Sequence, residues 1–537
     1  MNLKLTMMTA TLVTVLGISA CSTPPSQPSA SLPPNKDTLI IANGAEPATL
    51  DPQKSQDTTS SAIIRQMFEG LVMTDAQGKI IPGLAESWET TDNKVWTFKL
   101  RDANWSNGDA ISAHDAVFAL QRLVDPATAA YYSSYLVDAK VHNAEKVVTG
   151  DLPVDALGVK ALDDKTLQIT LDEPVPYLVD MLALPVAYPV PKAVVQAHGD
   201  SWLSLDNIVV SGAYRLSDWV VNSHINLERN PAYYDNANTA IEKVQFLPIT
   251  SSAGMNRYMT GELDINGVPP EVMDKVRKDL PNEMHTAPQL CTFYLEPNFK
   301  SAPFDDARVR QALSMSIERK TLTDILKRDN PEAYQFTPLA IQGITKISPD
   351  WQALDQSARY EQAISLLKDA GYDANNPLKF EFFYSTSETA KMLASAIDSM
   401  WRQNLGGVVQ VSLINQEWKT FLDAKNQGRY NLAFSGWCAD YNEPSSFLNI
   451  LKTGNSNNTG KYSSPQYDAI MAQTLQPGID DAARSRLYQE AETLIAKDTA
   501  IIPMYSAISV RLVKPYVKGF SHDNPMDDYH VKDMSFE

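Results

Sequence analysis

Hydrophobic and polar residues follow their most regular pattern between residues 378 and 436. Short apolar runs that suit strands are separated there by segments in which apolar residues recur every three or four positions. The pattern predicts strands at 378–384, 408–414 and 430–436, with helices at 388–404 and 416–426 between them. This alternation is typical of a doubly wound parallel sheet. Ligands of such sheets bind at the carboxyl ends of the strands, so we expect Trp418 and Asp440 on one rim.

The rest of the chain mixes the same two patterns. A long amphipathic helix is expected over residues 305–327, where Val309, Leu313 and Ile317 share one face. Further strands are predicted at 38–42, 95–101 and 166–171, and further helices at 60–68, 112–123 and 360–370. The chain is therefore expected to be an α/β protein.

A dense cluster of reactive and aromatic side chains follows the strand expected at 430–436. It reads Gly436-Trp437-Cys438-Ala439-Asp440-Tyr441-Asn442-Glu443-Pro444. An Asp in a closed site with aromatic walls needs a cationic partner, because an unpaired buried carboxylate is costly. The α-ammonium of a peptide supplies that charge and three hydrogen-bond donors. Asp440 is therefore predicted to bind a peptide N-terminus.

The residues of this cluster also have purely structural interpretations. Asp440 can be a loop or cap residue, and Glu443 competes with it as the ligand carboxylate, although its place before Pro444 favours a turn. Trp418 and Trp437 can be core residues, since Trp is usually mostly buried. A binding wall needs the same large aromatic surface, so both interpretations can hold.

Length and charge restrict the class of protein. A chain of 537 residues is too long to fold around a single hydrophobic core, so two or three domains are expected. The formal net charge of −18 disfavours nucleic acid and anionic membrane surfaces as partners, although solubility alone also explains it. The sequence contains no metalloprotease, P-loop, Cys-x-x-Cys or Gly-x-Ser-x-Gly motif, and the seven His are scattered and are interpreted as surface or capped residues. We expect no catalytic residue, no metal and no cofactor, and hence no enzyme.

The N-terminus indicates export. Lys4 precedes an apolar run over residues 7–20, which suits a signal peptide and is short for a membrane span. The run ends Ile18-Ser19-Ala20-Cys21, which resembles a bacterial lipobox and implies cleavage of residues 1–20 with lipid on Cys21. The alternative is an ordinary secretory signal. Residues 21–36 are rich in Pro and Ser and are predicted to form an extended tether.

Two further cysteines, Cys291 and Cys438, remain after Cys21. An exported compartment is oxidising, so a disulfide between them is expected, with two buried thiols as the alternative. Closing so long a loop restrains the unfolded chain by about 5 kcal/mol in the entropic model. The bridge would fasten the cluster around Asp440 to a distant segment.

Several segments together resemble one protein family. They are 82–88, 95–101, 226–231, 415–423 and 436–444. The chain from Thr38 onward resembles the extracytoplasmic oligopeptide-binding proteins of ABC importers, in the peptide/nickel class (family 5) of solute-binding proteins. The resemblance implies a class II periplasmic-binding-protein-like α/β fold with two hinged lobes and three subdomains. It places lobe I at 37–68, 190–290 and 509–537, subdomain II at 69–189 and lobe III at 291–508.

The resemblance also implies roles for individual residues. Asp440 resembles the partner of the peptide ammonium, and the residues that resemble main-chain partners of the peptide are Gly436, Trp437 and Cys438. Those that resemble pocket walls are Trp418, Tyr132 and Thr58. Lys327 and Lys425 resemble cations for a peptide carboxylate. The chain departs from the family at Gln56, where a carboxylate is common, and at Ala390, Phe434 and Ala507, where His, Arg and Tyr are common. Fewer cations favour longer peptides or a different end group.

The expected function is therefore that of a monomeric, lipid-anchored receptor in the periplasm or cell envelope. It would bind oligopeptides by main-chain contacts and hinge closure, and deliver them to an inner-membrane ABC permease. A murein-peptide binder on the same scaffold is the first alternative. An exported peptidase, or a chaperone or adhesin that uses the same cleft, is less favoured.

Overall fold

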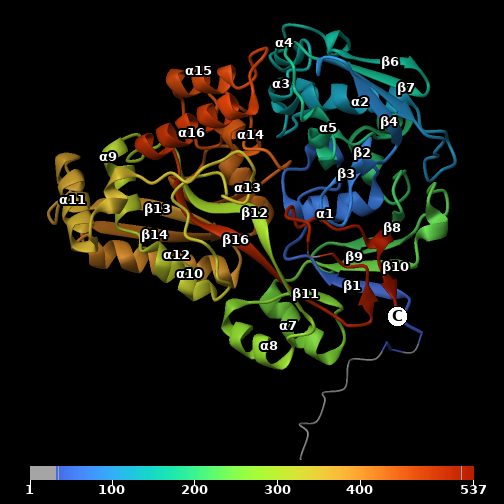
Figure 1. Ribbon diagram of the computed structural model, residues 1–537. Helices are drawn as coiled ribbons and strands as arrows, with labels where there is room; N and C mark the ends of the chain where they lie inside the picture. Colours follow the sequence, from blue (N-terminus) through green and yellow to red (C-terminus); the bar gives the residue numbers. More distant parts are fainter. Residues whose placement is uncertain (1–31, 34, 522) are drawn as a thin grey trace, which may run out of the picture.

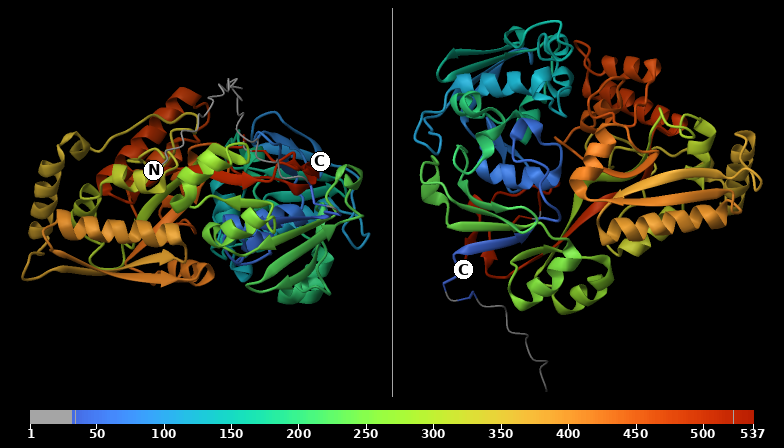
Figure 2. Two further views of the ribbon diagram at one scale, coloured as in Figure 1. Left: turned by 90° about the horizontal axis from the view of Figure 1, so that it is seen from below. Right: turned by 180° about the vertical axis from the view of Figure 1, so that it is seen from behind.

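One ten-stranded sheet runs through the molecule in the computed structural model, which describes residues 32–33, 35–521 and 523–537 (Figure 1). Its order is β14 (Val409–Gln416), β13 (Leu378–Ser385), β15 (Leu432–Cys438), β12 (Met284–Pro297), β16 (Ile502–Val513), β11 (Ile265–Gly267), β1 (Thr38–Ala42), β10 (Lys243–Leu247), β9 (His224–Arg229) and β8 (Tyr214–Val220). The two ends of this sheet belong to two halves of the molecule that face each other (Figure 2).

The predicted strand–helix alternation after residue 378 is confirmed. Helix α12 (Glu388–Asn404) follows β13, and α13 (Trp418–Asn426) follows β14. Strand β13 is parallel to β14 along its whole length, but it pairs with β15 only at Leu432 and Ala433. The expectation that Trp437 and Cys438 lie beyond the strand was wrong. Both pair with β12, so the antiparallel neighbour extends β15 to Cys438.

Two long strands join the halves. β12 and β16 are antiparallel, and their register shifts between Pro288 and Thr292 and again between Phe293 and Tyr294. The lobe boundaries expected at 290/291 and 508/509 fall within these strands, beside the irregularity. Because register shifts interrupt the hydrogen-bond ladder, the sheet can bend along this stretch.

A second, four-stranded sheet lies at the upper right of Figure 1. It consists of β4 (Ala85–Thr90), β5 (Val95–Leu100), β7 (Thr166–Thr170) and β6 (Val159–Asp163), and α2 (Ala113–Val124) packs on it. Ser112 caps α2 together with Asp115 in a capping box, as its position before the apolar pattern suggests. The core beneath this sheet includes Tyr441, which comes from the opposite half.

The prediction of a single helix over residues 305–327 was wrong. The segment forms α9 (Ala307–Met315) and α10 (Arg319–Leu326), with a break between them. At the break, the Ser316 hydroxyl donates to the carbonyl of Ala312, and the buried Arg319 side chain donates to the carbonyls of Ala333 and Pro503. The tertiary bonds of Arg319 redirect the chain although the apolar spacing continues.

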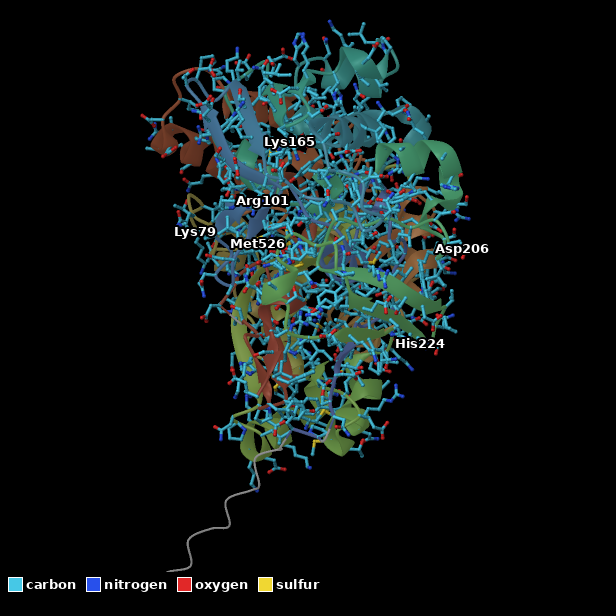
Figure 3. All side chains as sticks on the ribbon, turned by 90° about the vertical axis from the view of Figure 1, so that its right-hand side faces the viewer. Lys79, Arg101, Lys165, Asp206, His224 and Met526 are labelled. Atoms are coloured by element: carbon cyan, nitrogen blue, oxygen red, sulfur yellow. A yellow bond between two sulfur atoms is a disulfide. The ribbon has the colours of Figure 1, made fainter. Side chains whose placement is uncertain are left out.

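Residues 1–20, Cys21 and most of the predicted tether lie outside the described residues. Within the described part of the chain, no helix is long and apolar enough to cross a membrane. In the same part, no group of His, Cys, Asp and Glu side chains is arranged to hold a metal ion. His224 lies at the side of the molecule on β9 and contacts Asp218 at 2.7 Å (Figure 3).

Candidate functional site

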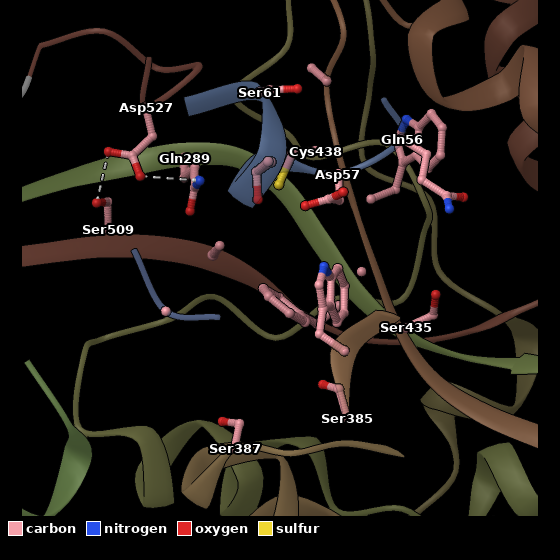
Figure 4. Close-up of a pocket in the computed structure, with 18 of the residues that line it drawn as sticks. Gln56, Asp57, Ser61, Gln289, Ser385, Ser387, Ser435, Cys438, Ser509 and Asp527 are labelled. Atoms are coloured by element: carbon pink, nitrogen blue, oxygen red, sulfur yellow. Dashed lines mark hydrogen bonds between the residues drawn. The ribbon is translucent and has the colours of Figure 1, made fainter. Parts of the chain in front are cut away.

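A cavity of about 590 Å³ lies between the two halves, and Figure 4 shows part of its lining. Most of the residues singled out from the sequence meet there: Thr58, Tyr132, Trp418, Lys425, Gly436, Trp437, Cys438 and Asp440 all line it. The four departures at Gln56, Ala390, Phe434 and Ala507 line it as well. Lys327 does not belong to this lining.

Asp440 lies where the halves touch. The Tyr132 hydroxyl, from the opposite half, donates to Asp440 Oδ1 at 3.0 Å, and the Asp440 amide donates to Ser446 Oγ at 2.7 Å. Asp440 forms no ion pair with any described residue, and Arg65 acts on it only from a distance. Burial raises the pKa of Asp440 to about 8. A cation that entered the cavity would therefore find an uncompensated acceptor.

Glu443, the competing carboxylate, has partners already. It accepts from Ser445 N at 2.7 Å and from the Tyr488 hydroxyl at 2.6 Å, and it is absent from the cavity lining. Of these two carboxylates, Asp440 lines the cavity and Glu443 does not.

The predicted disulfide between Cys291 and Cys438 is present and joins β12 to β15. The two Cα atoms are 4.0 Å apart, as in a non-hydrogen-bonded antiparallel pair, whose N–H and C=O groups point away from the partner strand. The adjacent pair is hydrogen-bonded, since Ala439 N donates to Leu290 O at 2.8 Å. Hydrogen-bonded and non-hydrogen-bonded pairs alternate along the two strands. The N–H and C=O groups of Gly436 therefore point in the same direction as those of Cys438.

The outer edge of β15 is therefore open beside Asp440. Strand β13 leaves β15 after Ala433, so no strand among the described residues covers Gly436 or Cys438 on that side. Both residues line the cavity. Their outward N–H and C=O groups form a short strand edge that can pair with an extended ligand.

Aromatic residues frame this edge. Trp437 stacks on Tyr132 with ring centroids 6.1 Å apart, and its indole N–H donates to Ser446 O at 2.9 Å. Trp418 stacks on Phe421 at 5.9 Å. These contacts hold the large side chains in place, so they act both as packing and as walls.

Neither expected lysine offers a free charge to the cavity. Lys425 pairs with the buried Glu296 at 2.6 Å, and the Glu296 side chain is only 8% exposed. Lys327 ends α10 in a left-handed conformation and pairs outside the cavity with Asp274 at 2.6 Å.

Sequence reasoning missed several charged residues of the lining. Arg65 pairs with Asp528 at 2.8 Å and Arg511 pairs with Asp527 at 2.5 Å, which links α1 (Thr58–Met67) and β16 to the C-terminal segment. Arg328 also lines the cavity. No periodic signal marks these positions, because long-range packing brings their segments together.

Direct contacts cross between the halves at several points. Gln56 Oε1 accepts from Asn426 Nδ2 at 2.9 Å, and the buried Asp138 accepts from Asn455 Nδ2 at 2.8 Å and from Lys452 Nζ. These bonds hold the halves in a closed arrangement around the cavity.

Comparison with known proteins places this geometry in a family. Residues 79–459 match the model for bacterial extracellular solute-binding proteins, family 5 Middle. The chain is 45% identical to the periplasmic oligopeptide-binding protein OppA of Salmonella typhimurium, with 99% of this chain and 98% of OppA covered. A crystal structure of Haemophilus influenzae OppA in complex with RPPGFSPFR superposes with a TM-score of 0.91 at 42% identity, covering 94% of this chain and 99% of that one.

A third relative reports on the arrangement of the lobes. The structure of the Escherichia coli murein tripeptide binding protein MppA superposes with a TM-score of 0.91 at 39% identity, covering 94% of this chain and 99% of that one. The unliganded open form of MppA superposes with a TM-score of only 0.64, with 94% of this chain and 98% of that one covered. The lobes described here are thus closed relative to that open form, and the class II periplasmic-binding fold is confirmed. The chain belongs to the bacterial extracellular solute-binding proteins of family 5, which are binding proteins and not enzymes.

Proposed function

We propose that the protein is a receptor that binds oligopeptides in this cavity and delivers them to an ABC importer. The open edge of β15 beside Asp440 carries the proposal, because it offers main-chain pairing and an ammonium acceptor at one place. The relatives named OppA are oligopeptide-binding proteins, and one was solved with a nonapeptide in place.

Main-chain pairing accounts for broad acceptance of peptides. A peptide that adds to an exposed strand edge forms hydrogen bonds through groups that every residue has. Its side chains point alternately to either side of the strand. Each needs only a pocket that is large enough, and water fills the remaining space where a side chain is small. Gly436 and Cys438 would bond the peptide backbone, while Trp418, Trp437, Tyr132 and Thr58 would form the walls.

Closure of the lobes completes the site. The proposed hinge is the register shift between β12 and β16, where the boundaries of lobes I and III were expected. Tyr132 reaches Asp440 only when subdomain II and lobe III meet, so peptide capture and closure support each other.

The cellular setting is part of the same proposal. Residues 1–20 would be removed, Cys21 would carry lipid, and residues 21–36 would tether a monomer in the periplasm near an inner-membrane permease. The Salmonella relative is named as periplasmic. Labelling with a radioactive fatty acid tests the anchor. Label that is absent from the wild type, or that persists in Cys21→Ser, would contradict it.

Calorimetry with tri-alanine and N-acetyl-tri-alanine tests the function. We expect saturable one-to-one binding of the free peptide, and binding at least tenfold weaker after acetylation. Intact peptide should be recovered after long incubation. Equal affinity for both peptides would contradict the role of Asp440, and no binding of any peptide would contradict the function.

A cell-wall peptide receptor is the second candidate, because MppA matches over nearly the same length. Competition between tri-alanine and the cell-wall tripeptide separates the two. We expect tri-alanine to compete well. Preference for the cell-wall tripeptide by a factor of about one hundred would favour the second candidate.

A further inference from the structure

The disulfide between Cys291 and Cys438 presents one of its two sulfur atoms to the cavity. Cys438 lines the cavity and is partly exposed, and Figure 4 shows its sulfur among the lining side chains. Cys291 is only 1% exposed and does not belong to the lining. A molecule in the cavity can therefore approach the sulfur of Cys438, while that of Cys291 is shielded.

The bridge lies on a face of the sheet that the cavity reaches. Cys438 and Gly436 are two residues apart in β15, so their side-chain positions share one face. Cys291 and Phe293 lie opposite them on β12. A Cβ atom on Gly436 would come within 3.0 Å of the ring of Phe293, which lines the cavity. The bridge and this ring are therefore neighbours on one wall, beside the proposed peptide site.

The open edge of β15 gives access to Cys438 from the direction that thiol–disulfide exchange needs. A thiolate attacks one sulfur of a disulfide and displaces the other, along the line of the bond that breaks. The bond runs from Cys291 on β12 to Cys438 on β15, so this line continues toward the side of β15 away from β12. Strand β13 does not cover that side beyond Ala433. A peptide paired with this edge would carry its side chains there.

Asp440 determines which part of a peptide would reach the sulfur. It follows Cys438 by two residues, which is about 7 Å along an extended chain. A peptide whose ammonium is bound by Asp440 would therefore place its first residues beside Cys438. A cysteine among those residues would be held near the bridge at a high effective concentration.

The burial of Cys291 distinguishes bound thiols from free ones. A thiolate leaves less readily from a buried site than from water, so dilute thiols should open the bridge slowly. A thiol held beside Cys438 does not depend on collisions from solution, and its effective concentration offsets this barrier. The reaction should therefore select peptides that bind in the cavity.

We propose that the bridge captures cysteine-containing peptides as mixed disulfides on Cys438. The inference rests on the proposed function, which supplies the bound peptide. The peptide thiol loses its proton to solvent, and its sulfur attacks Cys438 Sγ. A bond forms between these two sulfur atoms, and the bond to Cys291 breaks. Cys291 leaves as a thiolate and takes a proton from solvent, so one disulfide replaces another without net oxidation.

The released cysteine stays in place to reverse the reaction. Cys291 remains opposite Cys438 in the β12–β15 ladder, where the two Cα atoms are 4.0 Å apart. Its thiolate can attack Cys438 Sγ again, which frees the peptide thiol and restores the bridge. Capture would therefore lengthen the residence time of thiol peptides without consuming the protein.

Incubation with alanine tripeptides that carry one cysteine, at the first, second or third position, tests the proposal. Free thiols of the purified protein are alkylated beforehand, and the reaction is quenched in acid, alkylated in denaturant and mapped by mass spectrometry. At least one tripeptide should be joined to Cys438, with Cys291 alkylated in the same molecules. The rate should saturate with concentration, fall at least tenfold after N-acetylation of the tripeptide, and be suppressed by excess tri-alanine.

Two single variants test access to each sulfur separately. Cys291→Ser leaves Cys438 as a free thiol, and Cys438→Ser leaves Cys291. A pyridyl disulfide of the reactive tripeptide should label Cys438 at least tenfold faster than Cys291. Similar rates would contradict selective access to Cys438.

Attachment to Cys291, or equal rates for the free and N-acetylated tripeptides, would overturn the proposal. Calorimetry with the matching serine tripeptides separates its failure from that of the proposed function. If the serine tripeptides bind but no cysteine tripeptide forms a mixed disulfide, capture fails while the proposed function stands. If neither the serine tripeptides nor tri-alanine binds, both fail.

Discussion

The hydroxyl of Tyr132 donates to the carboxylate of Asp440 at 3.0 Å and joins the two halves of the molecule. This bond connects ligand recognition with closure, because the group proposed to bind the peptide ammonium also holds the opposite half. It leaves Asp440 buried and without an ion-pair partner in the described structure.

Replacing Asp440 by Asn should weaken binding of free peptides by about 2–5 kcal/mol, because a buried ammonium would lose its counter-ion. Binding of N-acetylated peptides should change little. Calorimetry with both peptides measures the two effects. Glu443→Gln is the matched control, since Glu443 lies outside the cavity lining, and it should preserve the difference between free and acetylated peptides.

The same residue should make the stability of the ligand-free protein depend on pH. The pKa of Asp440 is raised from 3.8 to about 8, so between these values the unfolded chain is ionised while the closed structure retains the proton. The unfolded state then binds fewer protons, and the contribution of Asp440 to stability falls as pH rises from about 4 to 8. Asp440→Asn should raise the melting temperature near pH 8 by a few degrees and hardly change it near pH 4. The same difference in melting temperature between Asp440→Asn and the wild type at both pH values would contradict this.

Peptide binding should release a proton near pH 7. Asp440 is mostly protonated there in the closed, empty site, and a bound ammonium favours its ionised form. Titration in buffers of different ionisation enthalpy should show close to one proton released in the wild type and about none in Asp440→Asn. Affinity should rise between pH 6 and 8, up to the point where the peptide ammonium itself loses its proton. Proton uptake would contradict the assignment.

Removing the disulfide between Cys291 and Cys438 should cost about 2–5 kcal/mol of stability. It should also weaken binding, because the bridge fixes the open edge of β15 against β12. The double variant Cys291→Ala/Cys438→Ala, measured by denaturant unfolding and calorimetry, tests both effects. A reducing agent should destabilise the wild type and leave the double variant unchanged.

Breaking the contact between Lys452 and Asp138 should speed the release of every peptide by a similar factor. This partly buried contact joins the halves outside the cavity lining, so it favours closure without touching a ligand in the cavity. Lys452→Met should raise dissociation rates about three- to tenfold, with the ranking of peptides unchanged. Lys320→Met, which removes an exposed helical ion pair with Asp324, is the control and should have no effect.

The sequence by itself determined the repeating strand–helix pattern after residue 378 and the strands around it. Apolar periodicity reports which face of an element is buried, and that information is local. The rule that ligands meet strand ends then brought Trp418 and Asp440 to one cavity. The cysteine pair was predictable because an oxidising compartment leaves few alternatives for two remaining thiols.

Only the tertiary structure decided the end of β15, the break between α9 and α10, and the presence of Arg328 instead of Lys327 in the cavity lining. Each depends on partners far away in the chain: β12 extends β15, Arg319 donates to the carbonyls of Ala333 and Pro503, and Asp274 holds Lys327 outside the cavity. Lys327 and Asp329 adopt left-handed backbone conformations on either side of Arg328. Neither is a glycine, so the sequence contains no signal for a turn here. Long-range pairing and backbone direction therefore decided which charged residues line the cavity.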